Sequence, residues 1–377
     1  MSLLDPEQIC ETMAGRPLTE LAPAHVVEGA RVLRADLDRG RWDVVGRRLV
    51  HLELRRIVGA WVASVLPAAP AAPPRPAPVV IVGLPRSGTT ILHHLFALDP
   101  AMAAPTLNDA TWPHTGSGAD DGASMLDAHL RLLDARSPDV QFLHPMAPDQ
   151  PEECSAALQL WFTSERFSMM FDAPGYRTWL AGADVAPVYR AHLGLVERVT
   201  RGTGDRPRRL VLKSPTHLAH LDALLDTFGP VHLVVLRRQA GDALASFGDL
   251  VHATRQVFTP EVDPEAIWDE WTPFWASALA RATTAIGARH HLVRSCTTYD
   301  FNEIRADPVA VVADYYRRQQ WDLTPRARDQ MTERAAATSS SALRPLRPVS
   351  AKSRDRRDEA ASLLAVADPE HRWHLDR

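Results

Sequence analysis

Short runs of consecutive apolar residues recur through the middle of the chain. The clearest is Val-Val-Ile-Val at residues 79–82, which ends at Gly83, and similar runs follow at residues 209–212, 231–236 and 291–294. Uninterrupted apolar runs of this length are typical of strands that are buried on both faces of a parallel sheet. Each of the first three runs is followed by a turn signal and then by a helical pattern. We therefore expect an α/β fold built on a parallel sheet flanked by helices.

Helical spacing of apolar residues outside these runs divides the chain into parts. Residues 1–66 are a predicted helical N-terminal appendage, and prolines among alanines at residues 67–78 predict an extended linker. Residues 79–335 are the predicted α/β domain, and residues 336–377 are a weakly patterned C-terminal tail. A long insertion at residues 105–205 is mostly helical by pattern and rich in Met, Trp and Phe, which suits a lid or an acceptor wall.

Composition narrows the class of protein. Hydrophobic residues make up 45% and charged residues 23% of the chain, so we expect a globular protein. The net charge of −4 gives no reason to expect nucleic acid as a partner, and any anion site must be a local cluster. The cysteines are far apart and suggest no disulfide framework and no zinc site. Because no leader pattern and no apolar stretch of about 18 residues occurs, we expect a cytoplasmic protein without stable membrane insertion.

The segment after the first predicted strand has the features of an anion site. A strand, a glycine turn and a helix beginning near Thr89 bring backbone N–H groups and the positive end of a helix to one point. Gly83 and Gly88 have the spacing of a nucleotide P-loop, so the sheet is expected to be of the P-loop type. Thr89 stands where a nucleotide hydrolase has lysine, and Arg86 inside the loop supplies the positive charge instead.

This loop resembles the phosphosulfate-binding loop of the sulfotransferases that use 3′-phosphoadenosine-5′-phosphosulfate (PAPS). It is similar in particular to a bacterial branch of that family, whose loop reads Pro-Arg-Ser-Gly-Thr-Thr rather than Pro-Lys-Ser-Gly-Thr-Thr. The resemblance implies that the 5′-phosphosulfate is held by the loop residues Pro85, Arg86, Ser87, Gly88, Thr89 and Thr90. It also implies that Arg86 stands at the position of the family's catalytic lysine.

A second segment extends the resemblance. Arg238 ends the third predicted strand, and Ser246 follows one to two helical turns later, so both can face the crevice at the carboxyl ends of the strands. The resemblance implies that these two residues bind the 3′-phosphate; otherwise they are an arginine that ends a strand and a serine on a surface helix. Relatives usually read Arg-Asp-Pro-Arg-Asp here, whereas residues 238–242 read Arg-Gln-Ala-Gly-Asp, so Arg237 is a candidate substitute for the missing arginine.

The resemblance covers roughly residues 79–325 and does not extend to the family's glycine-containing C-terminal cofactor loop. A basic stretch in the tail either closes over the phosphates or is a solvated run of charges. It consists of Arg344, Arg347, Lys352 and Arg354.

Sulfuryl transfer needs a base for the acceptor and cations near the oxygens that gain charge. Lys213 ends the second predicted strand, and Ser214 and Pro215 read as the N-cap and first turn of a helix that carries His217. Lys213 can thus stabilise the sulfuryl oxygens and His217 can act as the base, since imidazole changes protonation near neutral pH. The alternative is that Lys213 binds a carboxylate and His217 merely caps a helix.

Two carboxylates compete with His217 for the role of base. Glu152 and Glu153 lie in a stretch where members of the bacterial branch carry an acidic residue, and some sulfotransferases use glutamate as base. Carboxylates at the start of a helix also serve to complement its dipole. No acidic metal-binding motif lies near the loop, so no metal is expected.

We therefore expect a PAPS-dependent sulfotransferase of secondary metabolism that acts on a hydroxyl or amine of a small acceptor. Aromatic residues at helical spacing, mostly core residues by pattern, favour an apolar acceptor if some of them line the cleft. Two alternatives remain open: a nucleotide-dependent P-loop kinase and a non-catalytic nucleotide-binding homologue. The sequence leaves the oligomeric state undetermined.

Overall fold

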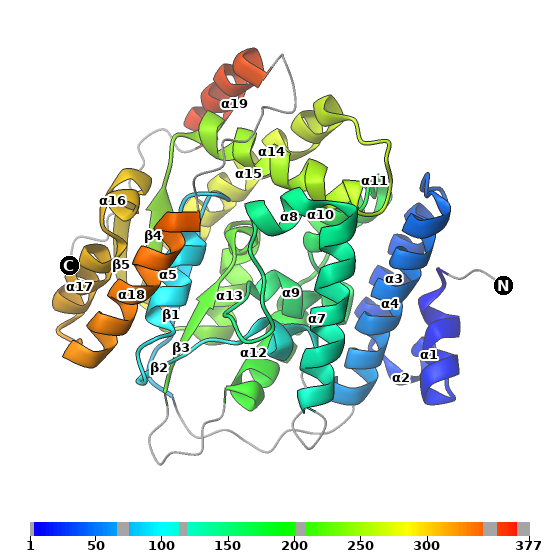
Figure 1. Cartoon of the computed structure of the whole chain (residues 1–377), viewed down its shortest axis with the longest axis horizontal. Coiled ribbons are helices and arrows are strands. Elements are labelled where there is room, and N and C mark those ends of the chain that lie inside the picture. The colour runs from blue at the N-terminus through cyan, green and yellow to red at the C-terminus, as the bar shows by residue number, and fades with distance from the viewer. Residues whose placement is uncertain (1–3, 66–74, 113–118, 201–207, 342–352, 368–377) are drawn as a thin grey trace. The chain divides into compact units, whose positions relative to one another are not determined.

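The computed structural model describes residues 4–65, 75–112, 119–200, 208–341 and 353–367 (Figure 1). The chain divides into two compact units, each assembled from several segments. The first unit comprises Met1–Ala72, Pro105–Val199 and Leu250–Asp263. The second comprises Pro73–Ala104, Thr200–Asp249 and Pro264–Arg377.

The second unit contains a five-stranded parallel sheet. The strands lie in the order β2-β3-β1-β4-β5, with β1 in the centre, and every strand pairs with its neighbours in the parallel sense. Their bounds are β1 Val79–Gly83, β2 Met102–Ala103, β3 Arg209–Lys213, β4 Val231–Arg237 and β5 Val293–Asp300. The α/β class and the parallel sheet predicted from the sequence are thereby confirmed.

Three of the four predicted strands agree with the structure to within one residue at each end. The fourth prediction, residues 291–294, was wrong in its position because residues His290–Leu292 form a 3-10 turn and β5 begins at Val293. β5 lies at the edge of the sheet, and most of its residues are partly exposed. Its polar composition therefore lacks the continuous apolar pattern that marks the central strands. The two-residue strand β2 is too short for any pattern to show.

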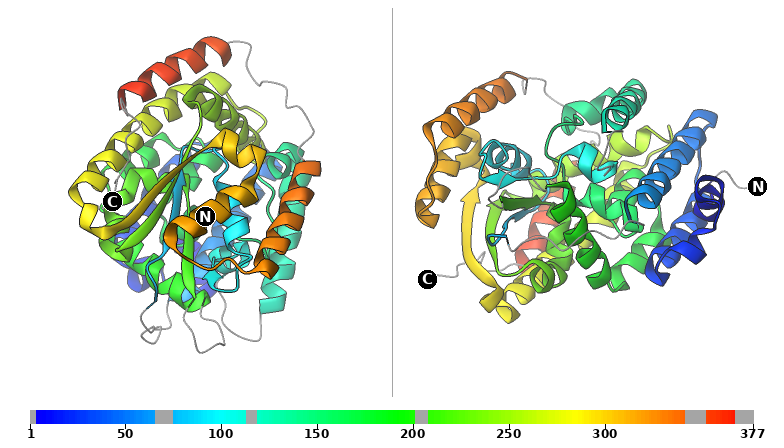
Figure 2. Two further views of the ribbon diagram at one scale, coloured as in Figure 1. Left: turned by 90° about the vertical axis from the view of Figure 1, so that its left-hand side faces the viewer. Right: turned by 90° about the horizontal axis from the view of Figure 1, so that it is seen from below.

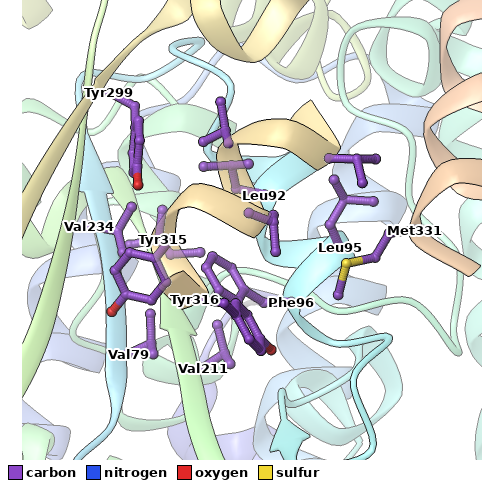
Figure 3. Packing of buried hydrophobic residues seen from close by; sticks show 14 of the residues in the cluster. Val79, Leu92, Leu95, Phe96, Val211, Val234, Tyr299, Tyr315, Tyr316 and Met331 are labelled. Carbon is purple, nitrogen blue, oxygen red and sulfur yellow. The ribbon is translucent and has the colours of Figure 1, made fainter. Parts of the chain in front are cut away.

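One face of the sheet packs on helices α5 (Thr89–Phe96), α17 (Pro308–Gln319) and α18 (Pro325–Ser341). Val79 and Ile81 alternate toward this face, as successive side chains of a strand must. Figure 3 shows the packed side chains of this core. Its members include Leu92, Leu95, Phe96, Val211, Val234, Tyr299, Tyr315, Tyr316 and Met331.

The side chains of β1 that alternate away from this core are buried as well. Val80 and Val82 are fully buried, and β1 contacts the 3-10 helix η2 (Pro215–His220). That helix in turn packs on α15 (Pro264–Ala288). The remaining helical elements of the second unit are α13 (Leu221–Phe228), the first part of α14 (Ala240–Gln256), η3 (His290–Leu292), α16 (Phe301–Ala306) and α19 (Ser353–Ala367). Because β1 is covered on both sides, its apolar run needs no polar face.

The first unit is helical at the positions that the structure describes. This agrees with the helical pattern of residues 1–66 and 105–205. In this unit, Asp36 accepts a hydrogen bond of 2.7 Å from the backbone N–H of Tyr176, which joins α3 (Ala24–Leu37) to α11 (Pro174–Gly182). Its helical elements are α1 (Pro6–Ala14), α2 (Leu18–Leu21), α3 (Ala24–Leu37), α4 (Val44–Val65), α6 (Leu107–Thr111), α7 (Ala119–Arg136), α8 (Pro138–Leu143), α9 (Cys154–Leu158), η1 (Gln159–Trp161), α10 (Arg166–Met170), α11 (Pro174–Gly182) and α12 (Ala186–Val199).

Two further features bear on the sequence predictions. Most of the predicted linker lies outside the described residues, and the weakly patterned tail contains helix α19. Within the described part of the chain, none of the helices combines the length and the apolar character needed to span a membrane.

A buried hydrogen bond ties α17 to the loop after α5 and gives a test of this packing. The Tyr316 hydroxyl donates to Asp99 Oδ2 at 2.6 Å, and both residues are buried. We expect Tyr316→Phe to lower the free energy of unfolding by about 1.5–3 kcal/mol, since a hydrogen bond to a charged group is lost. Urea unfolding measures the change.

Tyr299→Phe is the matched control. The Tyr299 hydroxyl donates to Asp314 at 2.9 Å, but Asp314 is 25% exposed and also pairs with Arg318. Its loss should therefore cost less. Equal losses in the two variants would contradict the importance given to the Asp99 contact.

Candidate functional site

The loop between β1 and α5 is shaped by the close approach of two strands. Gly83 pairs with Leu236 of β4, and a Cβ atom at Gly83 would lie 2.4 Å from the Leu236 carbonyl oxygen. No side chain fits at that distance, so glycine is required. The Ser87 hydroxyl then donates to the Leu84 carbonyl oxygen, which closes the turn inside the loop.

The loop leads into α5 at Gly88, the N-cap residue, whose φ of 90° is left-handed. Glycine offers no side-chain acceptor there, so the N–H groups of the first turn at Thr89 and Thr90 are not capped by the residue that begins the helix. Such a helix start, with the positive end of its dipole, attracts anions. The position where the sequence predicted a helix start, Thr89, is where α5 begins.

Arg86 has an unusual backbone for a residue with a side chain. Its φ is 64°, in the left-handed region that costs a non-glycine residue free energy. Arg86 makes two hydrogen bonds in this conformation, one through its backbone and one through its side chain. Its carbonyl oxygen accepts a hydrogen bond of 2.6 Å from Arg238, and its Nε donates to the Ser246 hydroxyl at 3.1 Å. The structure thus brings together the two segments that the sequence singled out.

Arg238 lies directly after β4 and is only partly exposed. Its guanidinium lies 4.4 Å from the centroid of the Phe301 ring, a cation–π contact that leaves the edge of the guanidinium available for hydrogen bonds. Burial lowers the pKa of Arg238, and nearby Arg305 and Arg357 lower it further, against the opposing effect of Asp242. A guanidinium in such surroundings is stabilised by an anion.

Lys213 ends β3, the other neighbour of β1, and pairs in register with Ile81. Its side chain is almost completely buried, and its ammonium donates to the Thr90 hydroxyl at 3.3 Å. A buried ammonium needs polar partners. This one reaches the first turn of α5, so the ends of β1 and β3 supply cations to the same helix start.

His217 lies in η2, four residues after Lys213. As predicted, Ser214 is the N-cap, and its hydroxyl accepts a hydrogen bond from Thr216, although the segment is a 3-10 helix rather than an α-helix. The His217 side chain is fully buried. The structure therefore places this histidine on the element that follows the Lys213 strand.

Glu152 and Glu153 belong to the first unit and precede α9. Glu152 is buried and lies 3.2 Å from His144 Nε2 and 3.5 Å from an Arg166 nitrogen. Glu153 is the N-cap residue of α9, and its carboxylate accepts a hydrogen bond from Ser155. Within its own unit, Glu152 is thus engaged with two basic side chains.

A model of the sulfotransferase family matches residues 78–325, more than half of the chain. The chain belongs to the sulfotransferase family. The matched segment agrees with residues 79–325, over which the resemblance was expected, and confirms the family prediction. No protein of curated function matches the chain in sequence.

Solved structures of sulfotransferases share the fold. Sulfotransferase STF1 from Mycobacterium tuberculosis superposes with a TM-score of 0.74 at 23% identity, over 96% of this chain and 97% of that chain. Sulfotransferase STF9 from Mycobacterium avium gives a TM-score of 0.73 at 20% identity, over 97% of this chain and 95% of that one. At these identities the likeness establishes the fold of the chain.

The structure qualifies two other expectations about basic residues. Arg237, the candidate substitute for a missing arginine, lies opposite Asp300 in the sheet, and its Nε is 3.4 Å from that carboxylate. In the basic stretch of the tail, Arg344, Arg347 and Lys352 lie outside the described residues, as does the side chain of Arg354.

Sequence reasoning assigned no role to the residues of α16. A capping box, in which Asp300 and Glu303 cap each other's backbone, starts this helix directly after β5. It places Phe301 under Arg238 and Ile304 against Gly88, where a Cβ atom would lie 3.2 Å from the Ile304 methyl group. The Asp-x-x-Glu spacing could have revealed the helix start.

Most of the aromatic residues that were candidates for an acceptor wall are core residues. Phe162 and Phe167 stack in the first unit, and Phe247 packs edge-on against Trp271 and Trp275 in the second. These side chains are buried. Among the residues that the structure describes, no group of three or more His, Cys, Asp and Glu side chains is placed to hold a metal ion.

The contact at Gly83 yields a prediction about the loop. We expect Gly83→Ala to destabilise the protein by about 1–3 kcal/mol, because the added methyl group forces β1 and β4 apart. Thermal unfolding measures the loss. Gly194→Ala in α12 is the control: a Cβ atom there meets nothing within 4 Å, so it should be neutral or stabilising by about 0.5–1 kcal/mol. An unchanged Gly83→Ala variant would show that β4 yields easily.

Proposed function

We propose that this member of the sulfotransferase family transfers the sulfuryl group of PAPS to a hydroxyl or amine of a small acceptor. The observation that carries the proposal is the hydrogen-bonded set of Arg86, Arg238 and Ser246 beside the start of α5. These residues and Lys213 supply donors and positive charge without a carboxylate ligand among them. Such a set suits a ligand with two separate phosphoryl groups.

PAPS supplies an activated sulfuryl group when bound, and the chain's residues would divide the remaining tasks. The backbone N–H groups and hydroxyls at Thr89 and Thr90, with Ser87 and Gly88 shaping the loop, would bind the 5′-phosphosulfate. Pro85 is buried at the start of this turn. Arg86 and Lys213 would stabilise the oxygens that gain charge as the sulfuryl group leaves. Arg238 and Ser246 would bind the 3′-phosphate.

A base must remove the proton of the acceptor, and we assign this role to His217. This residue follows Lys213 on η2, in the same unit as the loop, whereas Glu152 already lies beside His144 and Arg166. Glu152 and Glu153 remain the alternatives. An apolar acceptor such as a phenol is part of the proposal, and a panel of phenols and sugars tests it: activity on sugars alone would exclude it.

Arg238→Ala tests the nucleotide site. We expect the affinity for adenosine 3′,5′-bisphosphate to fall about 10- to 100-fold, since a charged hydrogen bond to phosphate contributes about 1.5–3 kcal/mol. Isothermal titration calorimetry measures it. Arg237→Ala is the matched control, because Arg237 pairs with Asp300 and should leave binding unchanged.

Three outcomes would contradict the assignment. An equal loss in Arg237→Ala would move the phosphate contact to that residue. A thermal stabilisation by ATP with magnesium, and none by the bisphosphate, would favour a P-loop kinase. Tight binding of the bisphosphate with no sulfate transfer to any acceptor would favour a non-catalytic homologue.

His217→Asn tests the base. Loss of general-base catalysis typically costs 10²- to 10⁴-fold, so we expect a fall of about that size in kcat, with bisphosphate affinity retained. Sulfate transfer followed by mass spectrometry across a pH series measures it. Glu152→Gln and Glu153→Gln should keep the pH profile of the wild type. If instead either glutamine variant abolishes the base-dependent limb of that profile, the base is the corresponding glutamate.

A further inference from the structure

Helix α19 packs along α15 (Figures 1 and 2). Ion pairs from one residue fasten it there. Arg356 of α19 lies 3.2 Å from Glu265 and 2.8 Å from Asp269, both on α15, and also pairs with Glu359 on its own helix. The Arg356 side chain is 28% exposed and Glu265 31%, whereas Asp269 and Glu359 are more than half exposed, so the pair with Glu265 is the least screened of the three. The next residue along the chain, Arg357, is therefore held in a defined place.

That place is the turn that follows Arg238. A Cβ atom at Gly241 would lie 2.6 Å from the Arg357 carbonyl oxygen and 3.0 Å from its Cβ. Such contacts are too short for any residue with a side chain. The backbone of α19 thus rests directly on the first turn of α14, and it does so because position 241 is glycine.

The side chain of Arg357 is incompletely satisfied in this position. One terminal nitrogen lies 3.7 Å from Asp242 Oδ1, which is beyond hydrogen-bond distance, and the Nε is buried with no hydrogen-bond partner among the described residues. The side chain is still 40% exposed, so a ligand can reach it. Because the Nε is enclosed by protein, the groups that a ligand can reach are on the exposed part of the guanidinium, and these can donate to a phosphate.

The charged side chains around Arg238 also carry an excess of positive charge. Arg305 of α16 and Arg357 of α19 both act on Arg238 as like charges, and among the described residues Asp242 is the acidic group that opposes them. Like charges gathered from a strand end and two helices repel one another unless an anion lies between them. A phosphate monoester carries up to two negative charges and accepts bidentate hydrogen bonds from guanidinium groups.

We propose that Arg357 is a further phosphate-binding residue of this chain, brought beside Arg238 by the docking of α19 on Gly241. The inference rests on the proposed function, because it takes Arg238 to bind the 3′-phosphate. Asp242 is the counter-ion of Arg357 when no nucleotide is bound, and the more highly charged phosphate displaces it. Closure of this end of the site thus depends on a helix more than 100 residues away in sequence from Arg238.

The test compares two ligands that differ only in the 3′-phosphate: adenosine 3′,5′-bisphosphate and adenosine 5′-monophosphate. We expect Arg357→Ala to weaken the bisphosphate about tenfold or more and to leave the monophosphate unchanged. Titration calorimetry measures both. An equal loss for the two ligands, or no loss, overturns the inference. If the wild type itself binds the two ligands equally, the proposed function fails first.

Three further variants separate charge from docking. Arg317→Ala, an exposed arginine on α17 that pairs with Asp314, is the control and should bind like the wild type. Asp242→Asn removes the competing carboxylate and should strengthen bisphosphate binding several-fold, and by less when Arg357 is absent, since Asp242 also acts on Arg238. Gly241→Ala changes no charge, yet it should weaken the bisphosphate as much as Arg357→Ala does, with no further loss in the double variant. Wild-type affinity in Gly241→Ala would overturn the role given to α19.

Discussion

The hydrogen bond from Arg238 to the carbonyl oxygen of Arg86 fixes the geometry on which the site depends. The left-handed backbone conformation of Arg86 costs about 1–3 kcal/mol, and this hydrogen bond helps to hold it. In this conformation the Arg86 side chain donates to Ser246. The loop after β1, the end of β4 and the first turns of α14 are therefore joined by hydrogen bonds within the protein. Pre-organisation of this kind lowers the entropy that binding must overcome.

This arrangement in turn depends on backbone contacts that only glycine permits. Gly83 lets β4 approach the start of the loop, and Gly88 begins α5 without a side-chain cap. The two glycines lie at the ends of the loop, and Arg86 between them carries the strain. The glycines at the two ends of the loop allow the chain to turn. The hydrogen bonds of Arg86 in the middle then restrict the loop to one conformation.

Much of this arrangement follows from the sequence because its causes are local. The apolar runs at β1, β3 and β4 predict a parallel sheet, and the carboxyl ends of parallel strands meet at one edge, so Arg86, Lys213 and Arg238 are expected there. β5 was placed too early because an edge strand with polar residues has no continuous apolar pattern. The assignment of the base between His217 and the glutamates depends on tertiary placement, which no local spacing encodes.

The position of Arg357 illustrates the same limit. Glycine at 241 signals a close approach of another backbone, but the sequence does not say which segment approaches. The partner is a helix in a tail whose pattern is weak; it is held to α15 by ion pairs, and its buried apolar residues are Ala360 and Leu364. Ion pairs between residues so far apart in sequence produce no periodic pattern from which the contact could be predicted.

The burial of Lys213 has a practical consequence. Lysine occurs in this chain only at positions 213 and 352. An amine-directed reagent therefore has few side chains to modify, and the one at the end of β3 is shielded from it while its ammonium rests against Thr90. Acylation of the single peptide that contains Lys213 becomes a selective chemical reporter of how often this part of the molecule opens to solvent.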